Sequence, residues 1–444
     1  MASTSSIANQ QQHAPLRIAI IGAGPVGLTL ASVLQKQQRD FLQQHPGHPA
    51  PLFTLTIYEA DQDEFVRSPG GSLDLRQGSG LQAIQAAGLM DAFHAVARPE
   101  GQYVLVLSKH GECLHEETSA DQDDTTYHPE IGRSHLNKLL RDSLAPGTIQ
   151  WGHKLLRVMP GDDNAAAPHV LEFANHKRVT ADLVVGADGT WSRIRPHVSA
   201  HKPKYSGVSF IDCAVRDFDQ RFPELVQLVG DGALYSFSQN RNIYAQRNDD
   251  GVVRVYAALR VDEDWHKHSP VAVARTDAER VQLLIDTYYH DWDERLHQLL
   301  WTVVTLPVDN KANSNNDDDK SDNEPSNMVI RPIYVLPLNH HWTHKRGFTL
   351  IGDAAHVMSP CAGEGVNTGM KDALDLAMAI MSSCTSSSRA SQLPVAIAAF
   401  EASMFSRAGA AAAKSARNLD VFFASKVATR EDALKIFARH ATAA

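Results

Sequence analysis

Short apolar runs followed by glycine-rich bends recur along the chain. Residues 16–21 (LRIAII) and 52–60 (LFTLTIYEA) have the apolar character of strands buried on both faces of a parallel sheet. Residues 179–185 and 348–351 are similar, and helical patterns follow the first and the last of these runs after a bend. The pattern therefore predicts an α/β domain with a parallel sheet at its centre.

Between residues 205 and 308, apolar residues alternate with polar ones instead. This alternation is typical of antiparallel strands with one face against a core. The clearest predicted strands lie at residues 233–238, 242–246 and 252–260, with a hairpin turn at 248–251. One face of such a sheet would roof a pocket, and Tyr244, Gln246 and Arg254 are then candidate substrate contacts. The alternative is that these side chains belong to an ordinary core.

The bend after the first apolar run contains GxGxxG, as Gly22, Gly24 and Gly27. The first glycine permits a tight turn, the second lets a pyrophosphate approach the backbone, and the third lets the helix pack on the strand. Glu59 ends the second apolar run, where an acidic side chain can bind the ribose hydroxyls of an adenosine. GxGxxG alone is weak evidence, but this strand, helix and acid together predict a dinucleotide site.

A second candidate site follows the apolar run at residues 348–351. Asp353 would stand at the carboxyl end of that strand, where its carboxylate can accept hydrogen bonds from a ribityl or ribose hydroxyl. Pro360 and Gly363 belong to a glycine-rich segment that lets main chain approach a flat ligand. The next helix would offer an anion the free N–H groups of Gly365, Val366 and Asn367. The alternative is a strand, a loop and an amphipathic helix without a ligand.

Four further charged residues lie close to these bends in the sequence. Arg67 and Asp74 belong to a glycine-rich loop that could meet a ribityl chain or a nicotinamide phosphate, unless it is an ordinary surface loop. Arg133 begins a predicted helix, where the macrodipole disfavours a cation, so its partner is a ligand or, alternatively, solvent. Asp188, in GADG, either contacts a nucleotide or only caps the segment that follows it, and both interpretations stay open.

Composition excludes several classes of function. The formal net charge is -9 and no Lys/Arg cluster is interleaved with aromatic residues, so no nucleic-acid partner is expected. Four widely spaced cysteines provide neither a metal knuckle nor a local redox pair, and they fit a reducing compartment. No apolar run approaches the roughly 20 residues of a membrane helix, and the N-terminal segment lacks the apolar core of a signal peptide. We therefore expect a cytoplasmic protein with no membrane span and no metal site.

Three motifs together resemble those of the group A FAD-dependent monooxygenases, the aromatic-hydroxylase type. They are GAGPVG at 22–27, GADGTWSRIRP at 186–196 and LIGDAAHVMSPCAGEGVNTG at 350–369. Within that group the chain is similar to the tetracycline-inactivating monooxygenases and their fungal-type relatives. The marks of that similarity are GGSLDLRQGSG at 70–80, PEIGR at 129–133 and DWDER at 291–295. The resemblance covers nearly the whole chain.

The resemblance implies roles for individual residues. Arg67 matches a position that contacts the reduced nicotinamide cofactor, and Pro360 and Gly363 match the substrate-pocket wall beside the flavin. The positions that match FAD contacts are Asp74, Arg133 and Asp353. The chain departs from the tetracycline-inactivating enzymes where a glutamine, an arginine and a histidine hold the antibiotic. The residues at those positions are Asp212, Ala233 and Arg254.

The activity that the resemblance implies is that of an FAD-dependent monooxygenase. It would use NADPH or NADH and molecular oxygen to hydroxylate a polycyclic aromatic or a tetracycline-like or polyketide-like molecule through a flavin C4a-hydroperoxide. The resemblance also suggests a monomer and a link to antibiotic resistance, and it identifies no side chain as the acid or base. Competing hypotheses are another flavin-dependent oxidoreductase, either an oxidase or a disulfide reductase, and a non-catalytic flavin-binding protein.

The expected fold is a Rossmann-like FAD-binding domain of the glutathione-reductase type, joined to a second domain built on an antiparallel sheet and to a C-terminal helix. The FAD-binding domain is predicted to be discontinuous, with residues 15–200 and 329–400. The other predicted parts are a disordered tail (1–14), a substrate domain (201–328) with a disordered acidic insertion (311–326), and a C-terminal bridging helix (401–444).

Overall fold

The computed structural model describes residues 14–48, 51–64, 70–118, 128–161, 167–305, 327–386, 388–424 and 429–437. Arg67, the acidic insertion and all of the predicted tail except its last residue lie outside these ranges.

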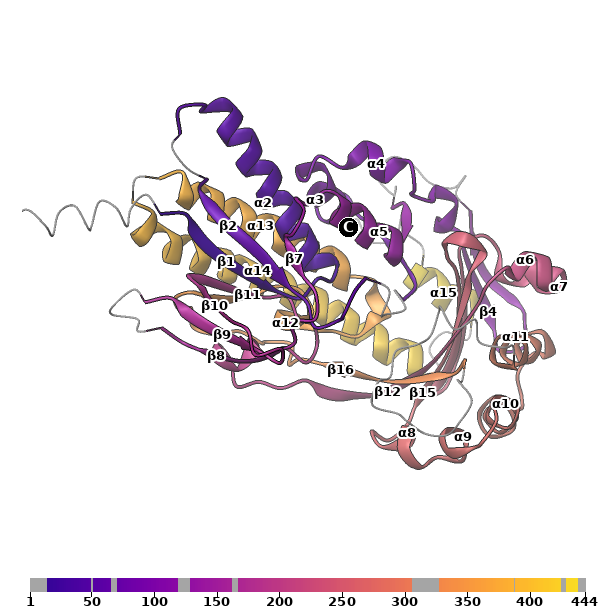
Figure 1. The fold of residues 1–444 in the computed structure, drawn as a ribbon. Helices are drawn as coiled ribbons and strands as arrows, with labels where there is room; N and C mark the ends of the chain where they lie inside the picture. The colour runs from indigo at the N-terminus through magenta and orange to yellow at the C-terminus, as the bar shows by residue number, and fades with distance from the viewer. Residues whose placement is uncertain are drawn as a thin grey trace, which may run out of the picture.

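The first lobe is built on a five-stranded parallel sheet (Figure 1), in the order β17-β11-β1-β2-β7. Its strands are β1 (Leu16–Ile21), β2 (Phe53–Tyr58), β7 (Ile149–Gln150), β11 (Leu183–Gly186) and β17 (Phe348–Leu350). Helices α2 (Pro25–Gln44) and α13 (Gly365–Cys384) pack against each other beside this sheet. The apolar runs thus form the buried parallel sheet that the sequence predicts.

A three-stranded antiparallel sheet covers the first lobe on the side away from α2 (Figure 1). Its strands are β8 (Leu155–Met159), β9 (His169–Phe173) and β10 (Arg178–Ala181). The single strand predicted at 179–185 is therefore two strands in two sheets. The chain changes sheets at Asp182, whose carboxylate accepts hydrogen bonds from the Arg17 backbone N–H (2.9 Å) and from its guanidinium (2.6 and 3.0 Å). Val179 and Ala181 of β10 lead almost directly into the apolar strand β11, so the hydrophobic pattern alone does not separate the two strands.

The second lobe contains a seven-stranded sheet in the order β16-β12-β15-β14-β13-β4-β5. Its strands are β4 (Val104–Ser108), β5 (Cys113–Glu117), β12 (Lys204–Val215), β13 (Ala233–Ser238), β14 (Arg241–Arg247), β15 (Val253–Arg260) and β16 (Val329–Val335). All neighbours pair antiparallel except β13 and β4. The three strands predicted from alternation are confirmed to within one residue at each end. The domain division differs from the expected one, because β4, β5 and β16 come from segments assigned to the FAD-binding domain.

The two faces of the seven-stranded sheet have different neighbours. Residues such as Ile243 and Val255 face a core under the helices drawn at the right of Figure 1. Those helices are α6 (Phe218–Arg221), α7 (Pro223–Val229), α8 (Trp265–His268), α9 (Pro270–Val273), α10 (Asp277–Leu284), a π-helical turn (Ile285–Tyr289) and α11 (Glu294–Thr305). The alternate residues, including Tyr244 and Tyr256, face the first lobe. Strand alternation therefore presents an aromatic face to the space between the lobes.

A small two-stranded sheet and short helices complete the first lobe. These elements are β3 (Ser72–Asp74), α3 (Gly80–Ala86), α4 (Met90–His94), a 3-10 turn (Pro99–Gln102), β6 (Glu130–Gly132), α5 (Arg133–Asp142), a 3-10 turn (Arg195–His197), α12 (Asp353–His356) and a 3-10 turn (Pro360–Ala362).

Helix α14 (Arg389–Phe423) connects the two lobes and is followed by α15 (Arg430–Phe437). The sequence predicted a C-terminal helix over residues 401–444, but α14 begins earlier, at Arg389, and continues through Pro394. In the first lobe the Glu401 carboxylate accepts hydrogen bonds from Trp342 Nε1 (3.1 Å) and Thr349 Oγ1 (2.9 Å). Near its other end, Phe422 packs on Phe237 of β13 with ring centroids 4.8 Å apart. Among the described helices, none has the length and apolarity required to cross a membrane.

Candidate functional site

A cavity of about 1960 Å³ lies between the two lobes. The parallel sheet contributes the bends after β1 and β17, and the seven-stranded sheet contributes its aromatic face. Ligand pockets usually measure roughly 300–1,000 Å³, so this volume can hold two ligands side by side.

The glycines after β1 differ in what surrounds them. A Cβ on Gly22 (φ +108°) would lie 2.4 Å from the Ala187 carbonyl oxygen, and a Cβ on Gly27 would lie 2.2 Å from the Gly22 carbonyl oxygen. A Cβ on Gly24 would meet no atom within 4 Å, and Gly24 lines the cavity. The protein itself thus requires glycine at 22 and 27. At position 24 only a ligand would require it.

Glu59 stands directly after β2 at the edge of the cavity. Its buried carboxylate accepts hydrogen bonds from the Ala23 N–H (2.6 Å) and the Asp61 N–H (3.1 Å), one on each oxygen. A carboxylate can accept about four hydrogen bonds, so two sites are left for the hydroxyls of a ligand.

Helix α13 begins at the cavity. Gly365 and Val366 line it, and a Cβ on Gly365 would meet no atom within 4 Å. The N–H groups of a first helical turn have no acceptor within the helix, and the macrodipole places partial positive charge there. This helix start is therefore suited to bind an anionic group.

The Asn367 side chain binds the neighbouring loop and does not face the cavity. It is 2% exposed and does not line the cavity. Its Oδ1 accepts a hydrogen bond from the Arg76 N–H (2.9 Å), and its Nδ2 donates one to the Asp74 carbonyl (2.7 Å). Its amide thus holds the loop after β3 against α13, and only its backbone N–H belongs to the helix start.

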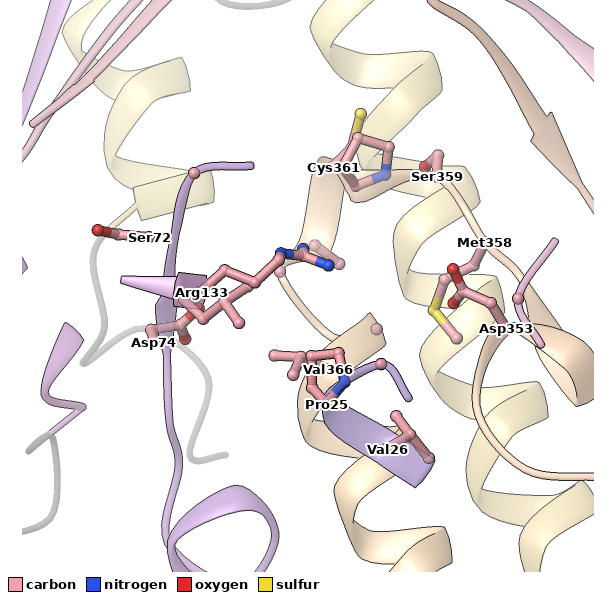
Figure 2. A pocket seen from close by; sticks show the side chains of 18 of the residues that line it. Pro25, Val26, Ser72, Asp74, Arg133, Asp353, Met358, Ser359, Cys361 and Val366 are labelled. Atoms are coloured by element: carbon pink, nitrogen blue, oxygen red, sulfur yellow. The ribbon is translucent and has the colours of Figure 1, made fainter. Parts of the chain in front are cut away.

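Asp74 and Arg133 both line the cavity, but only Asp74 has a charged partner among the described residues. The Asp74 carboxylate pairs with Arg76 (2.8 Å), which also pairs with Glu364 (2.6 Å). Arg133 forms no ion pair within the described chain, and its buried Nε has no hydrogen-bond acceptor there. Figure 2 shows its side chain pointing into the cavity, with Asp353 on the far side. Burial lowers the pKa of the Arg133 guanidinium because it disfavours the charged form. An anionic or carbonyl partner in the cavity would stabilise that charged form.

Asp188 and Asp353 lie at the carboxyl ends of neighbouring strands. Asp188 Oδ2 accepts a hydrogen bond from the Arg193 N–H (2.7 Å), whereas Oδ1 is buried with no partner in the described residues. Burial raises the pKa of Asp188. The carboxylate of Asp353 has no hydrogen-bond partner in the described chain. Asp188 therefore caps the following turn and also lines the cavity.

Four of the five predicted substrate contacts line the cavity, and Arg254 is the exception. The four are Tyr244, Gln246, Pro360 and Gly363. Arg254 is 4% exposed and pairs with Asp212 at 2.8 Å, and Asp212 also binds Arg331 at 2.9 Å. We therefore correct the expectation that Arg254 contacts the substrate. Its guanidinium is bound by a carboxylate on β12 that the local sequence does not place beside it.

Several lining residues carry no obvious signal in the sequence. They include Gln102, His128, Glu130, His153, Lys154 and Trp191. Glu130 could have been singled out, because it is the acidic residue in the PEIGR motif, inside a strand whose three residues are all buried. The others stand in turns, in loops or next to strand ends, where periodicity gives no indication of the side that a residue faces.

Comparisons with known proteins agree with this geometry. A protein-family profile described as "FAD binding domain" matches residues 16–286 and 325–394. Monooxygenase penA of Penicillium thymicola is 34% identical over 395 residues, which cover 81% of this chain and 84% of that protein. Monooxygenase asqM of Emericella nidulans is 30% identical over 462 residues, which cover 94% and 97%.

Solved structures show the same fold at low sequence identity. Klebsiella pneumoniae HpxO, complexed with FAD and uric acid, has a TM-score of 0.69 at 17% identity, with 92% of this chain and 89% of that chain covered. Tetracycline destructase Tet(51) has a TM-score of 0.63 at 17% identity, with 96% and 95% covered.

Proposed function

This chain belongs to the FAD binding domain family and is an FAD-dependent monooxygenase, and on that premise we propose that it uses NADPH or NADH and molecular oxygen to hydroxylate a polycyclic aromatic or polyketide-like molecule. One observation carries the proposal. A single cavity joins the dinucleotide bend of the first lobe to the aromatic face of the second, with a volume suited to a cofactor and a substrate together.

The first-lobe part of the cavity fits FAD. Gly24 would allow the pyrophosphate to approach, and Glu59 would bind the adenosine ribose. Arg133 points into the cavity and forms no ion pair within the described chain, and Asp353 lines the cavity on the far side; the cofactor's phosphates, hydroxyls and ring carbonyls would supply partners for both. Bound FAD supplies the redox chemistry, accepting a hydride from the nicotinamide and activating oxygen for transfer of one oxygen atom to the substrate.

The start of α13 would tune the electrostatics at the reactive end of the site. The N–H groups of Gly365, Val366 and Asn367 provide partial positive charge where negative charge develops on reduction. They belong to a helix of 20 residues packed on α2 and α14, so they are already oriented before a ligand binds.

The second lobe would position an aromatic substrate. Tyr235, Tyr244 and Tyr256 line the cavity beside Phe422 of α14. Burial raises the pKa of Tyr256 to about 12 and that of Tyr244 well above its ordinary value, so both phenols stay neutral at physiological pH. Such a wall can stack on a ring system and keep water away from it. At the positions that correspond to the antibiotic contacts of the tetracycline-inactivating family, this chain has Ala233 and a buried pair of Asp212 and Arg254, so we propose another polycyclic substrate.

Two rival activities make different demands on the chain. A disulfide reductase needs a pair of adjacent thiols, whereas all four cysteines lie apart as free thiols in the described residues. An oxidase would release hydrogen peroxide instead of inserting oxygen, and the experiment below distinguishes it.

We also propose that the nicotinamide cofactor binds transiently at the surface and that the protein acts as a cytoplasmic monomer.

The test is a screen of the FAD-loaded protein with polycyclic phenols and tetracyclines. A substrate should stimulate NADPH or NADH consumption and appear as a product heavier by one oxygen atom. Heat-inactivated protein and substrate-free reactions are the controls, and hydrogen peroxide is measured in parallel. Peroxide equal to the NAD(P)H consumed, with no oxygenated product for any stimulating compound, would contradict the proposal.

A further inference from the structure

The turn between β14 and β15 reaches from the second lobe to the start of α5. Asp249 begins this turn, and its side chain is 10% exposed. Its Oδ2 accepts a hydrogen bond from the Gly132 N–H (2.7 Å) and lies 2.6 Å from His135 Nδ1. Gly132 precedes α5 and His135 belongs to its first turn, so one oxygen of the second lobe contacts the chain on both sides of Arg133.

Gly132 leaves the space that this carboxylate occupies. A Cβ at position 132 would lie 2.0 Å from Asp249 Oδ2, whereas the backbone there, at φ −60° and ψ 137°, suits any residue. The glycine of the PEIGR motif is therefore required by the approach of Asp249 and not by the conformation of the turn. Because glycine has no side chain with which to cap a helix, a carboxylate of the other lobe binds the N–H at this helix start.

The residues before Asp249 bind the neighbouring strand β3. Asn248 Oδ1 accepts a hydrogen bond from the Ser72 N–H, and Gln246 Nε2 donates one to the Ser72 carbonyl (3.2 Å). Ser72 pairs with Gly132 across the two-stranded sheet. The end of β14 and its turn thus hold both strands of the sheet that leads into α5, and β14 also belongs to the aromatic face of the cavity.

Arg133 is the first residue of α5, and the direction of its side chain follows from the backbone at that point. The side chain points into the cavity (Figure 2) and packs on Gly70, where an added Cβ would lie 3.3 Å from the Arg133 Nε. It forms no ion pair within the described chain, so Asp249 is not its partner. What the carboxylate of Asp249 fixes is the helix turn from which the guanidinium projects.

We propose that Asp249 is a positioning residue, which holds the start of α5 from the second lobe so that the Arg133 guanidinium is directed toward FAD. The inference rests on the proposed function, because it requires FAD beside Arg133. Neither Asp249 nor His135 lines the cavity, so the effect on FAD has to pass through Arg133. The strand that presents the aromatic face to a substrate thereby also sets the geometry of a cofactor contact in the other lobe.

The experiment measures dissociation constants for FAD, from the change in flavin fluorescence when the FAD-free protein is titrated. The variants are Asp249→Ala, Arg133→Met and both together, because a double-mutant cycle shows whether two residues act as one unit. Asp249→Asn is the conservative variant, since its amide oxygen can still accept from the Gly132 N–H. Asp219→Ala is the matched control, because it removes a carboxylate that binds Arg247 of the same strand (2.7 Å) outside the cavity. Urea unfolding of the FAD-free protein is measured for every variant.

We expect Asp249→Ala to weaken FAD binding about 10-fold, because a guanidinium that is free to turn away makes weaker hydrogen bonds to the cofactor. In the Arg133→Met background the same change should alter the affinity less than about 2-fold, since no guanidinium is left to position. Asp249→Asn should retain most of the wild-type affinity, and Asp219→Ala all of it. A purely structural role would instead lower the urea midpoint of Asp249→Ala and weaken FAD binding by the same factor in both backgrounds.

Four results would overturn the inference. These are an affinity for FAD in Asp249→Ala equal to that of the wild type, an equal loss in both backgrounds, an equal loss in Asp219→Ala, or an unchanged affinity in Arg133→Met. If Asp249→Ala does not fold, Asp249→Ser, whose hydroxyl is too short to reach the Gly132 N–H, takes its place in the same cycle. Failure of the proposed function looks different, because it appears as an FAD-loaded wild type that oxygenates no compound, while the affinities for FAD still decide the role of Asp249.

Discussion

Replacing Gly24 by alanine tests whether this glycine is needed for binding a ligand and not for folding. A Cβ at this position meets no protein atom within 4 Å, and the backbone, at φ −74° and ψ 174°, suits any residue. The apoprotein should tolerate the change. Because alanine restricts the unfolded chain more than glycine does, the free energy of unfolding should rise by about 0.4–1 kcal/mol.

Gly27 is the matched control, three residues along the same motif. Its added Cβ would lie 2.2 Å from the Gly22 carbonyl oxygen and 3.3 Å from the Ala187 Cβ. The first neighbour is backbone, so relief requires the turn after β1 to move. Overpacking of this kind costs about 1–3 kcal/mol, of which the better helix propensity of alanine returns about 1 kcal/mol. The apoprotein carrying Gly27→Ala should therefore be destabilised, unlike Gly24→Ala.

Gly24→Ala should weaken the binding of FAD, although it does not destabilise the FAD-free protein. Its methyl group occupies the space through which a pyrophosphate would approach the backbone, and a misfit of about 1.4–3 kcal/mol corresponds to a loss of roughly 10-fold to 150-fold in affinity. Urea unfolding of the FAD-free proteins and titration with FAD, followed by flavin fluorescence, measure the two quantities. Affinity equal to the wild type, or an apoprotein less stable than Gly27→Ala, would refute the assignment of this bend to the cofactor.

Three further substitutions test other parts of the molecule. Arg133→Met should leave the FAD-free protein at least as stable in urea as the wild type, because it removes a buried unpaired charge. It should also weaken FAD binding about 10-fold to 100-fold, since hydrogen bonds to charged groups contribute about 1.5–3 kcal/mol. Arg254→Met should lower the free energy of unfolding by about 3 kcal/mol by breaking a buried pair, yet leave the KM for the substrate unchanged. Asp182→Asn should lower the urea midpoint at pH 7, and its difference from the wild type should vanish in acid. Burial alone would raise the pKa of Asp182, but the hydrogen bonds from Arg17 lower it below 3.8, the ordinary value, in the folded protein. The carboxylate therefore stabilises the fold fully above pH 3.8, and this contribution to the free energy of unfolding is lost as the pH falls through the folded pKa.

Each of these expectations has a contrary outcome. Unchanged FAD affinity in Arg133→Met would mean that its guanidinium faces solvent or substrate. A higher KM with unchanged stability in Arg254→Met would restore its role as a substrate contact. A stability difference in Asp182→Asn that persists at pH 2 would show that the carboxylate charge is not what holds β1 to the segment between β10 and β11.

The local features of the chain were determined by sequence alone. The continuous apolar run of β1 matches Leu16–Ile21 at both ends, and β13 matches Ala233–Ser238, because hydrophobic period and strand length are properties of consecutive residues. The glycine bends and the family follow for the same reason, since a turn, a close backbone approach and a helix start are each encoded within a few positions.

Tertiary structure decided what depends on residues far apart in the chain. Asp212 binds Arg254 across 42 positions, and this turns an apparent substrate contact into a buried pair. Strands β4 and β5 leave the first lobe to complete the second sheet, although their pattern would suit either. Glu130 acquires its raised pKa from burial and from Asp74 and Asp249, which only the fold brings together. Charge, burial and missing hydrogen-bond partners are properties of a place in space, and a one-dimensional pattern does not contain them.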